Sequence, residues 1–277
     1  ELRAELARPP RALRAVSPVE GAQLIKLATG ALVTRSRDID GIAYGNPRDV
    51  WLVDDGLGLQ WAFIGLVPTR RQLLRASHGF VTLRSGVPIG YGQMDTLFGC
   101  ADVSFNSFDT FRGAESAWIF VRLLAATQAL LGAHAFTLDG YQLGHHNEEA
   151  IASGAWWFYY KLGFRPRSAA MRALAQTEAA RVRANPRHRS SMATLRRLAS
   201  DELVFSTAAS GAPRWNRLAA LEKRVASRFA GMEGSKREAM RREYSHQALR
   251  ILGVRGGADS AADQPDVRHA WQAWAPL

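Results

Sequence analysis

The chain has little cysteine and no long hydrophobic run. Its single cysteine, Cys100, excludes an internal disulfide framework and any zinc site built from several cysteines. A reducing, cytoplasmic setting is therefore expected. No apolar run reaches the ~18 residues needed to cross a bilayer, so no membrane span is predicted. The basic N-terminal segment is not followed by an apolar core, which excludes a secretory signal peptide. The first residue is Glu1 rather than Met, which indicates a processed end or a segment of a longer protein.

Acidic residues are fewer than basic residues. Lysine and arginine number 36 against 25 aspartates and glutamates, which gives a net charge of +11 and a pI of about 10.6. Such a field attracts polyanions, for example nucleic acid, coenzyme A, an acidic carrier protein or an anionic membrane surface. General use of arginine for solubility is the alternative explanation, because net charge reports on association and not on fold. With 47% hydrophobic residues among 277, the chain can bury one large core or two small ones.

The first hundred residues are mostly typical of antiparallel strands. Before them, Ser17, Pro18 and Glu20 form the capping-box start of a helix. Alternating apolar residues and turn signals predict the following elements: a strand–turn–strand at 49–68, a short helix at 69–78, a second hairpin at 79–99 with its turn at Ser85-Gly86, and a strand at 101–109.

The apolar period then becomes that of a helix. A helix is predicted from Glu115 to Leu131 and is closed by Gly132, and a short strand follows at 134–141. Asn147 caps a further helix that is predicted to run unbroken to Gly163, before a strand at 164–167. Beyond about residue 168 the sequence consists of Arg-rich amphipathic helices. This order predicts an α+β fold of the α/β/α-sandwich type, with a mixed, mostly antiparallel sheet flanked by helices and an Arg-rich helical C-terminal extension.

Two motifs between residues 79 and 170 resemble the GCN5-related N-acetyltransferase (GNAT) family. In that family a strand ends in a loop of the form R/Q-x-x-G-x-G/A, which opens a helix and binds the pyrophosphate of acyl-CoA through its backbone N–H groups. Free N–H groups and the positive end of a helix dipole suit an anion. The matching segment here is Arg112-Gly113-Ala114-Glu115-Ser116-Ala117, in which Glu115 replaces the middle glycine. A carboxylate within ~4 Å of a pyrophosphate would cost on the order of 1–4 kcal/mol.

The second motif is "YYKLGFRP" at 159–166, similar to the family segment in which a helix carrying Tyr and Lys ends in Leu-Gly-Phe and enters a strand. The alignment places Tyr159 at the family's conserved tyrosine, which often lies beside the CoA sulfur and protonates the departing thiolate. A phenol suits that role because it is neutral at pH 7. Packing in the aromatic run 156–160 is the structural alternative for Tyr159. The family's frequent Asn at the helix start does not align, since Ala152 stands there.

The resemblance implies a divergent member of the family, with a lead-in segment at 1–17, an acyltransferase domain at 18–170, a basic helical extension at 171–255 and a flexible tail at 256–277. It implies that acetyl-CoA or another acyl-CoA binds at the loop Phe111, Arg112, Gly113, Ala114, Glu115, Ser116 and Ala117. Tyr159 is the candidate acid. Asp109, Asp139 and Glu115 are candidate bases among which the sequence does not choose, and each is equally explained as a surface or capping carboxylate.

The implied activity is direct transfer of an acyl group from acyl-CoA to an amine acceptor. Two alternatives stay open: a GNAT-like transferase whose donor is an acyl carrier protein or an aminoacyl-tRNA, and a non-catalytic domain that binds nucleic acid or a protein partner. Glu115 and the arginine-rich helices favour these alternatives. No metal is expected, because the spacing of His145, His146, Glu148 and Glu149 fits no common zinc signature and helix capping explains the two acids.

Overall fold

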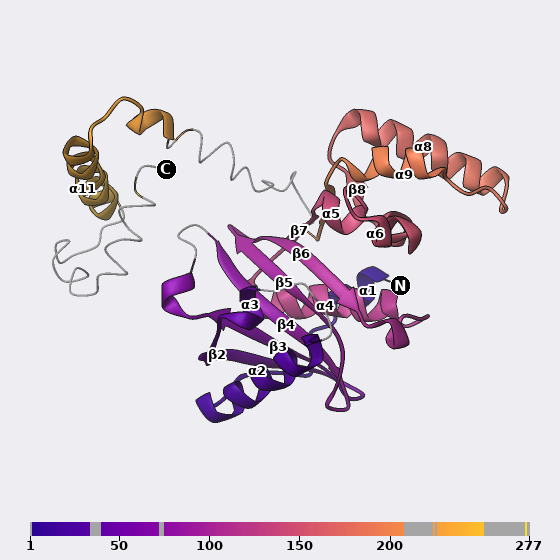
Figure 1. The fold of residues 1–277 in the computed structure, drawn as a ribbon, viewed down its shortest axis with the longest axis horizontal. Helices are drawn as coiled ribbons and strands as arrows, with labels where there is room; N and C mark the ends of the chain where they lie inside the picture. The colour runs from indigo at the N-terminus through magenta and orange to yellow at the C-terminus, as the bar shows by residue number, and fades with distance from the viewer. Residues whose placement is uncertain are drawn as a thin grey trace. The chain divides into compact units, whose positions relative to one another are not determined.

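The computed structural model describes residues 2–33, 40–71, 75–207, 224, 226–251 and 275. The chain divides into two compact units. The first consists of Glu1–Arg71 and Ala76–Pro213, and the second of Gln72–Arg75 and Arg214–Leu277. The first unit contains the whole described sheet and both sequence motifs (Figure 1).

The first unit is built on one mixed sheet. Within the described residues its strand order is β1-β2-β3-β4-β5-β6-β7-β9-β8. Only β6 and β7 are parallel, and all other neighbours are antiparallel. The strands are β1 (Ala12–Ala15), β2 (Gly45–Gly56), β3 (Leu59–Leu66), β4 (Ala76–Arg84), β5 (Val87–Leu97), β6 (Cys100–Ser107), β7 (Ala135–Leu138), β8 (Arg165–Pro166) and β9 (Leu203–Ser206).

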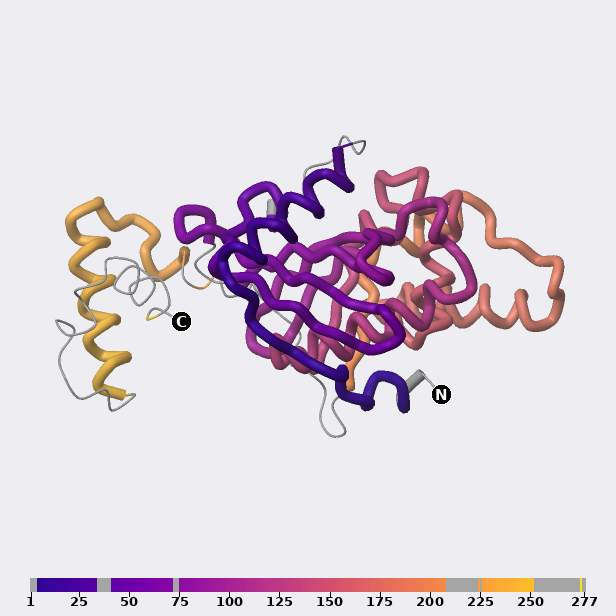
Figure 2. The backbone as a smooth tube through the Cα atoms, turned by 90° about the horizontal axis from the view of Figure 1, so that it is seen from below, coloured from indigo at the N-terminus to yellow at the C-terminus, as the bar shows by residue number. Residues whose placement is uncertain are grey.

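Helices cover both faces of this sheet. On one face Ile64 and Val81 pack with Ala28 of α2 (Pro18–Leu32) and Ile42 of α3 (Asp40–Ala43), and Figure 2 shows the indigo α2 along that side. On the other face the sheet packs against α4 around Phe120. The predicted α+β sandwich is confirmed. The helices of this unit are α1 (Leu2–Ala7), α2 (Pro18–Leu32), α3 (Asp40–Ala43), α4 (Ser116–Leu131), α5 (Gly140–Leu143), α6 (Glu148–Ala152), α7 (Ala155–Lys161), α8 (Ala169–Ala184) and α9 (Met192–Ala199), with 3₁₀ turns η1 (Pro68–Arg70) and η2 (Asp109–Phe111).

The local capping signals act as the sequence predicts. The Ser17 hydroxyl accepts the Glu20 N–H at 3.2 Å and caps α2. The Asn147 side chain accepts the Ala150 N–H at 3.2 Å and caps α6. Gly132 ends α4 at φ +66°, a left-handed conformation that favours glycine.

Two predicted helices differ from the structure. The helix expected from Asn147 to Gly163 is two helices, because Gly154 adopts φ +72° and separates α6 from α7. The stretch 69–78 is not one helix either. It contains the end of η1, and Ala76 already begins β4, whose backbone pairs with both β3 and β5.

The compact unit that contains the sheet extends beyond residue 170, where the sequence predicts the end of the acyltransferase domain. Helices α8 and α9 and strand β9 belong to the same compact unit as the sheet. Strand β9 lies between β7 and β8, so the sheet is incomplete without residues 203–206. The short run "LVFS" supplies these residues between two Arg-rich helices.

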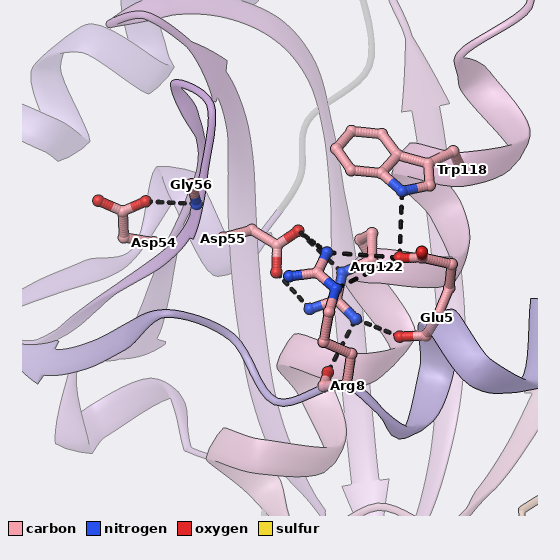
Figure 3. Close-up of polar contacts among 7 residues, drawn as sticks. All are labelled: Glu5, Arg8, Asp54, Asp55, Gly56, Trp118 and Arg122. Atoms are coloured by element: carbon pink, nitrogen blue, oxygen red, sulfur yellow. Dashed lines mark hydrogen bonds and ion pairs between the residues drawn. The ribbon is translucent and has the colours of Figure 1, made fainter.

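The N-terminal segment, which the sequence predicts as a lead-in at 1–17, packs on the domain through α1 and β1. Strand β1 pairs with β2 at the sheet edge, and α1 packs on α4. Arg122 of α4 is fully buried, donates to the carbonyl oxygens of Glu5 and Arg8, and forms a two-pronged ion pair with Asp55 of β2 (Figure 3). The Trp118 indole N–H adds a hydrogen bond to the Glu5 carboxylate at 3.3 Å. These contacts fix α1 and β1 to the domain.

The second unit is described at Arg75, at residue 224, over residues 226–251 and at Ala275. Its α11 (Gly234–Ile251) is the basic helix expected in this region, and Phe229 is buried next to Tyr244, with the ring centroids 6.3 Å apart. The predicted tail at 256–277 lies outside the described residues apart from Ala275. In the part of the chain that the structure covers, no helix combines the length and the hydropathy needed to cross a membrane.

Candidate active site

The sheet opens into a cleft where β6 and β7 separate. Their parallel pairing covers only Cys100–Asp102 and Ala135–Thr137. Strand β6 continues to Ser107, whereas β7 ends at Leu138. The far end of β6 therefore borders a cleft of about 300 Å³, whose walls are Phe105, Asn106, Ser107, Arg112, Gly113, Ser116, Gln142, Asn147, Glu149, Ala150, Ser153, Ala155, Phe158 and Tyr159.

The cleft brings together the two sequence motifs. Arg112, Gly113 and Ser116 come from the loop that follows β6, and Tyr159 comes from α7. The start of α4 lies at this wall, and first-turn N–H groups of a helix have no acceptor within the helix itself. The start of α4 can therefore attract an anion to the cleft, and the buried phenol of Tyr159 lines the same cleft.

The Gly113–Ser116 turn is closed on itself. The Gly113 N–H donates to the Ser116 hydroxyl at 3.1 Å, and the Ser116 N–H donates to the Gly113 carbonyl at 3.1 Å. The Gly113 N–H that the resemblance assigns to a pyrophosphate is therefore already bonded. No heavy atom lies within 4 Å of the position that a Cβ on Gly113 would take, so the space beside this glycine is open.

Arg112 is held by carboxylates on both sides of the loop. Its guanidinium lies 2.9 Å from Glu149 of α6 and 3.1 Å from Asp109 of η2, and its Nε donates to the Ser107 carbonyl at 3.3 Å. The side chains of Arg112, Asp109 and Glu149 are all exposed to solvent. An anionic ligand would have to compete with these two carboxylates for Arg112, because a planar guanidinium binds carboxylates and phosphates equally readily in geometric terms.

Glu115 points away from the cleft. It stands at the N-cap of α4 without accepting a hydrogen bond there, and its carboxylate lies 3.5 Å from Arg84 of β4. Its side chain is 67% exposed and forms no part of the cleft wall. Glu115 is therefore a solvent-facing acid, and the side of the turn that faces the cleft is left to Gly113.

At the coenzyme A site that the resemblance implies, replacing Glu115 with glycine is therefore expected to change the Kd for coenzyme A by less than about twofold, because exposed charges are strongly screened. Isothermal titration at 0.15 M salt measures this. Arg84→Gln, which removes the partner of Glu115, is the matched control and is expected to behave alike. A tenfold gain in affinity for Glu115→Gly would show that the carboxylate faces the phosphates.

Tyr159 is enclosed by aromatic rings. It is 4% exposed, and its ring lies 5.2 Å from Phe120 and 6.1 Å from Phe164, measured between centroids. Burial raises the pKa of the Tyr159 hydroxyl well above its usual range. The phenol therefore keeps its proton at neutral pH. Packing and proton donation are compatible here, because the ring fills the core while the residue still lines the cleft.

Gln142 of α5 occupies the open edge of β6. Its side-chain carbonyl accepts the Phe105 N–H at 3.2 Å, and its amide group donates to the Ser104 hydroxyl at 3.1 Å. The Gln142 side chain thus takes the hydrogen bond that a neighbouring strand would otherwise make. A ligand containing an amide could replace it at the same N–H group.

The other predicted residues do not line this cleft. Asp139 caps α5 by accepting the Tyr141 N–H at 2.7 Å, and Asp109 lies in η2 beside Arg112. Ala114 and Ala117 are also absent from the cleft wall. Phe111 lines a separate, largely apolar groove of about 770 Å³ beside α2. That groove is larger than the cleft, but it contains neither the Arg112–Ser116 turn nor Tyr159.

Sequence reasoning missed Gln142 and Glu149 as wall residues and Asp102 as an unusual carboxylate. Burial is the main cause that raises the pKa of Asp102 to about 6, against the effect of a hydrogen bond from Thr137. A two-residue turn at Phe98-Gly99 fixes the register of β5 and β6 and thereby pairs Asp102 with Asp95. This pairing of two carboxylates could have been predicted from the sequence. The described residues contain no group of three or more His, Cys, Asp or Glu side chains that could hold a metal ion.

Both motifs occupy the structural positions that the resemblance implies. The Arg112 loop joins the end of β6 to the start of α4, and β7 lies between the motifs in sequence. Helix α7 carries Tyr159 and Lys161, ends in Leu-Gly-Phe and enters β8. The domain has a divergent GNAT-like fold.

Comparisons with known proteins add little to this description. No protein-family model matches the chain, and no curated protein matches it. Among solved structures, a dodecameric spermidine N-acetyltransferase from Vibrio cholerae shares 12% identity at a TM-score of 0.30, over 57% of this chain and 80% of that one. A mutant form of SpeG spermidine N-acetyltransferase from Vibrio cholerae shares 13% at 0.31, over the same fractions. Likeness at this level assigns neither a reaction nor a substrate.

Proposed function

We propose that the chain is an N-acyltransferase that moves an acyl group from acyl-CoA to an amine in the cleft between β6 and β7. The observation that supports this most directly is the meeting of Arg112, Gly113 and Ser116 with Tyr159 around one cleft. These residues lie in two motifs that are far apart in sequence. Together they offer an anion site at a helix start and a protonated phenol, the parts that a thioester donor requires.

In the proposed reaction the amine lone pair attacks the thioester carbonyl carbon. The C–S bond then breaks, the amide forms, and the thiolate takes the proton of the Tyr159 hydroxyl. The amine loses one proton to a base or to water, and solvent reprotonates the phenolate. Holding both reactants in one cleft supplies much of the rate, because it makes the attack effectively unimolecular.

The donor would lie along the β6 edge with its pyrophosphate at the Arg112–Ser116 turn. This requires the Gly113 N–H to leave the Ser116 hydroxyl and Arg112 to exchange a carboxylate for a phosphate. Phe111, Ala114, Glu115 and Ala117 belong to the same predicted loop and would support the turn without lining the cleft. Asp109 and Asp139 stay the sequence-based candidates for the base, although one pairs with Arg112 and the other caps α5.

Gln142 would compete with the donor for the Phe105 N–H. Gln142→Ala is expected to tighten acyl-CoA binding roughly 3- to 10-fold, because a hydrogen bond that the donor must displace contributes about 0.5–1.5 kcal/mol. Titration calorimetry with acetyl-CoA measures the effect. Gln128→Ala, an amide lost from the C-terminal turn of α4, is the matched control. Weaker binding in Gln142→Ala would instead make Gln142 a contact to the donor.

The proposal is tested by heating the protein with acetyl-CoA, longer acyl-CoAs and free coenzyme A, and by following acyl transfer to a panel of amines. A ligand at 100 times its Kd stabilises the folded state by about 2.7 kcal/mol. The absence of any shift and of any transfer would overturn the acyl-CoA donor. The self-closed turn and the two carboxylates on Arg112 favour the alternative of a macromolecular donor, so an acylated carrier protein and an aminoacyl-tRNA belong in the same assay.

A further inference from the structure

A row of polar residues crosses the middle of the sheet. Ser77 of β4 lies directly opposite Asp95 of β5, Asp95 opposite Asp102 of β6, and Asp102 opposite Thr137 of β7. Side chains directly opposite each other on neighbouring strands point to the same face. The four side chains therefore form one continuous row, called here the acidic row, on the sheet face opposite α4.

The two aspartates at the centre of the acidic row oppose each other with like charge. Like charges directly opposite on neighbouring strands destabilise a sheet. Two further carboxylates, Asp139 and Glu202, act on Asp102 with the same sign as Asp95, and their repulsion adds to burial in raising its pKa. The fold thus concentrates negative charge at one place in a chain whose net charge is +11.

The partners of these carboxylates are mostly neutral. Asp95 accepts from the Gln93 amide at 3.1 Å and Asp102 accepts from the Thr137 hydroxyl at 3.1 Å. Within the described residues no lysine or arginine pairs with Asp95, Asp102 or Asp139, whereas Glu202 pairs with Arg167 at 2.8 Å. The repulsion at the centre of the row is therefore not offset by a cation from the described part of the protein.

Ser77 provides an independent sign of a missing partner. Its side chain is only 7% exposed, and its hydroxyl has no hydrogen-bond partner among the described residues. A buried hydroxyl that makes no hydrogen bond destabilises the folded state, because it has lost its bonds to water without replacing them. Because Ser77 stands directly across from Asp95, a group that donates to both would satisfy the hydroxyl and neutralise the carboxylate.

An organic ammonium group fits these features better than a metal ion. The described residues hold no cluster of three or more ligands suited to a metal. Carboxylates on neighbouring strands are spaced by roughly 4.8 Å, which suits a cation that donates several hydrogen bonds in different directions. The row offers three acceptors to such a group: the two carboxylates and the Ser77 hydroxyl.

The acidic row lies close to the cleft along β6. Ser104 follows Asp102 by two residues on the same face, roughly 7 Å along the strand. The Ser104 hydroxyl accepts a hydrogen bond from Gln142, a wall residue of the cleft.

We propose that the acidic row binds a second positive charge of the amine acceptor, and hence that the substrate is an aliphatic diamine. This inference rests on the proposed function, since it places the reacting nitrogen in the cleft and the second ammonium group at Asp95 and Asp102.

Calorimetric titration at pH 7.5 with 1,5-diaminopentane and with 1-aminopentane tests this. We expect the diamine to bind the wild-type chain at least tenfold more tightly than the monoamine. Asp95→Asn/Asp102→Asn is expected to lose at least tenfold in diamine affinity, while Glu233→Gln, an exposed carboxylate in the second unit, is expected to lose none. Asp102→Asn alone serves as a second variant with an intermediate loss.

A stability measurement separates a binding site from a purely structural row. Without ligand, Asp95→Asn/Asp102→Asn is expected to melt at the same temperature as the wild type or higher, because it removes the repulsion. Equal diamine affinity in the wild type and the double variant, equal affinity for the diamine and the monoamine, or no binding of the diamine would overturn the inference. Separate titration with acetyl-CoA keeps the two proposals apart: diamine binding without acetyl-CoA binding would refute the acyl-CoA donor alone, and the reverse would refute the acidic row alone.

Discussion

Arg122→Met is expected to lower the free energy of unfolding by about 3–5 kcal/mol, a large part of the stability of a typical domain. Both side chains of the Arg122–Asp55 pair are fully buried. Removing the guanidinium leaves the Asp55 carboxylate with Arg8 as its only cationic partner among the described residues, and the Arg8 side chain, 3.1 Å away, is 43% exposed. The carbonyl groups of Glu5 and Arg8 also lose a donor. Urea unfolding followed by circular dichroism measures the loss.

Two further variants show whether the buried charge causes this effect. Arg122→Met/Asp55→Leu is expected to recover much of the lost stability, because replacing both members of a buried pair by apolar groups is often neutral. Arg196→Met, which breaks an exposed pair with Glu148, is expected to change stability little. If Arg122→Met unfolded at the wild-type urea concentration, the contacts of Figure 3 would not be what holds α1 and β1 to the domain.

Features that depend on a few neighbouring residues could be predicted from the sequence. The caps at Ser17 and Asn147 and the end of α4 at Gly132 follow from one side chain or one backbone conformation each. The hairpin turn at Ser85-Gly86 is of the same kind. The sequence also predicted that Arg112 lies in a loop between a strand and a helix, and that Tyr159 lies in a helix followed by a strand. These two predictions assigned both motifs to one domain.

Features that depend on distant partners could not be predicted in this way. Strand β9 is a four-residue run whose identity depends on pairing with β7 and β8. Arg122 lies inside an apolar helix, and nothing nearby in the sequence shows that Asp55 and the α1 carbonyls would meet it. The break at Gly154 was hidden because apolar residues continue on both sides of it. The site shows the same division: the loop and Tyr159 could be found, but the Arg112–Glu149 pair and the Gln142 contact required the fold.

Tyr159→Phe is expected to lower acyl-transfer turnover by about 10²-fold, the lower end of what a positioned acid contributes, and to change the Kd for acyl-CoA by less than about twofold. The phenylalanine ring keeps the contacts with Phe120 and Phe164, so only the hydroxyl is lost. Because burial raises the pKa of Tyr159, the wild-type acid stays protonated through neutral pH and turnover should not fall there on its account. Steady-state rates with acetyl-CoA, together with calorimetric titration, separate the two effects.

A leaving-group series distinguishes proton donation from a packing defect. A thioester whose thiol has a lower pKa leaves with less help from an acid, so the deficit of Tyr159→Phe should shrink as the thiol pKa falls. Tyr160→Phe is the matched control: its ring stacks on Trp156 at 5.0 Å, it lies outside the cleft wall, and its turnover should be close to wild type. A proton donor must matter most where the thiolate is the poorest leaving group. A turnover deficit that is the same for every thioester, or unchanged turnover in Tyr159→Phe, would therefore show that this hydroxyl takes no part in the reaction and that Tyr159 is a core residue.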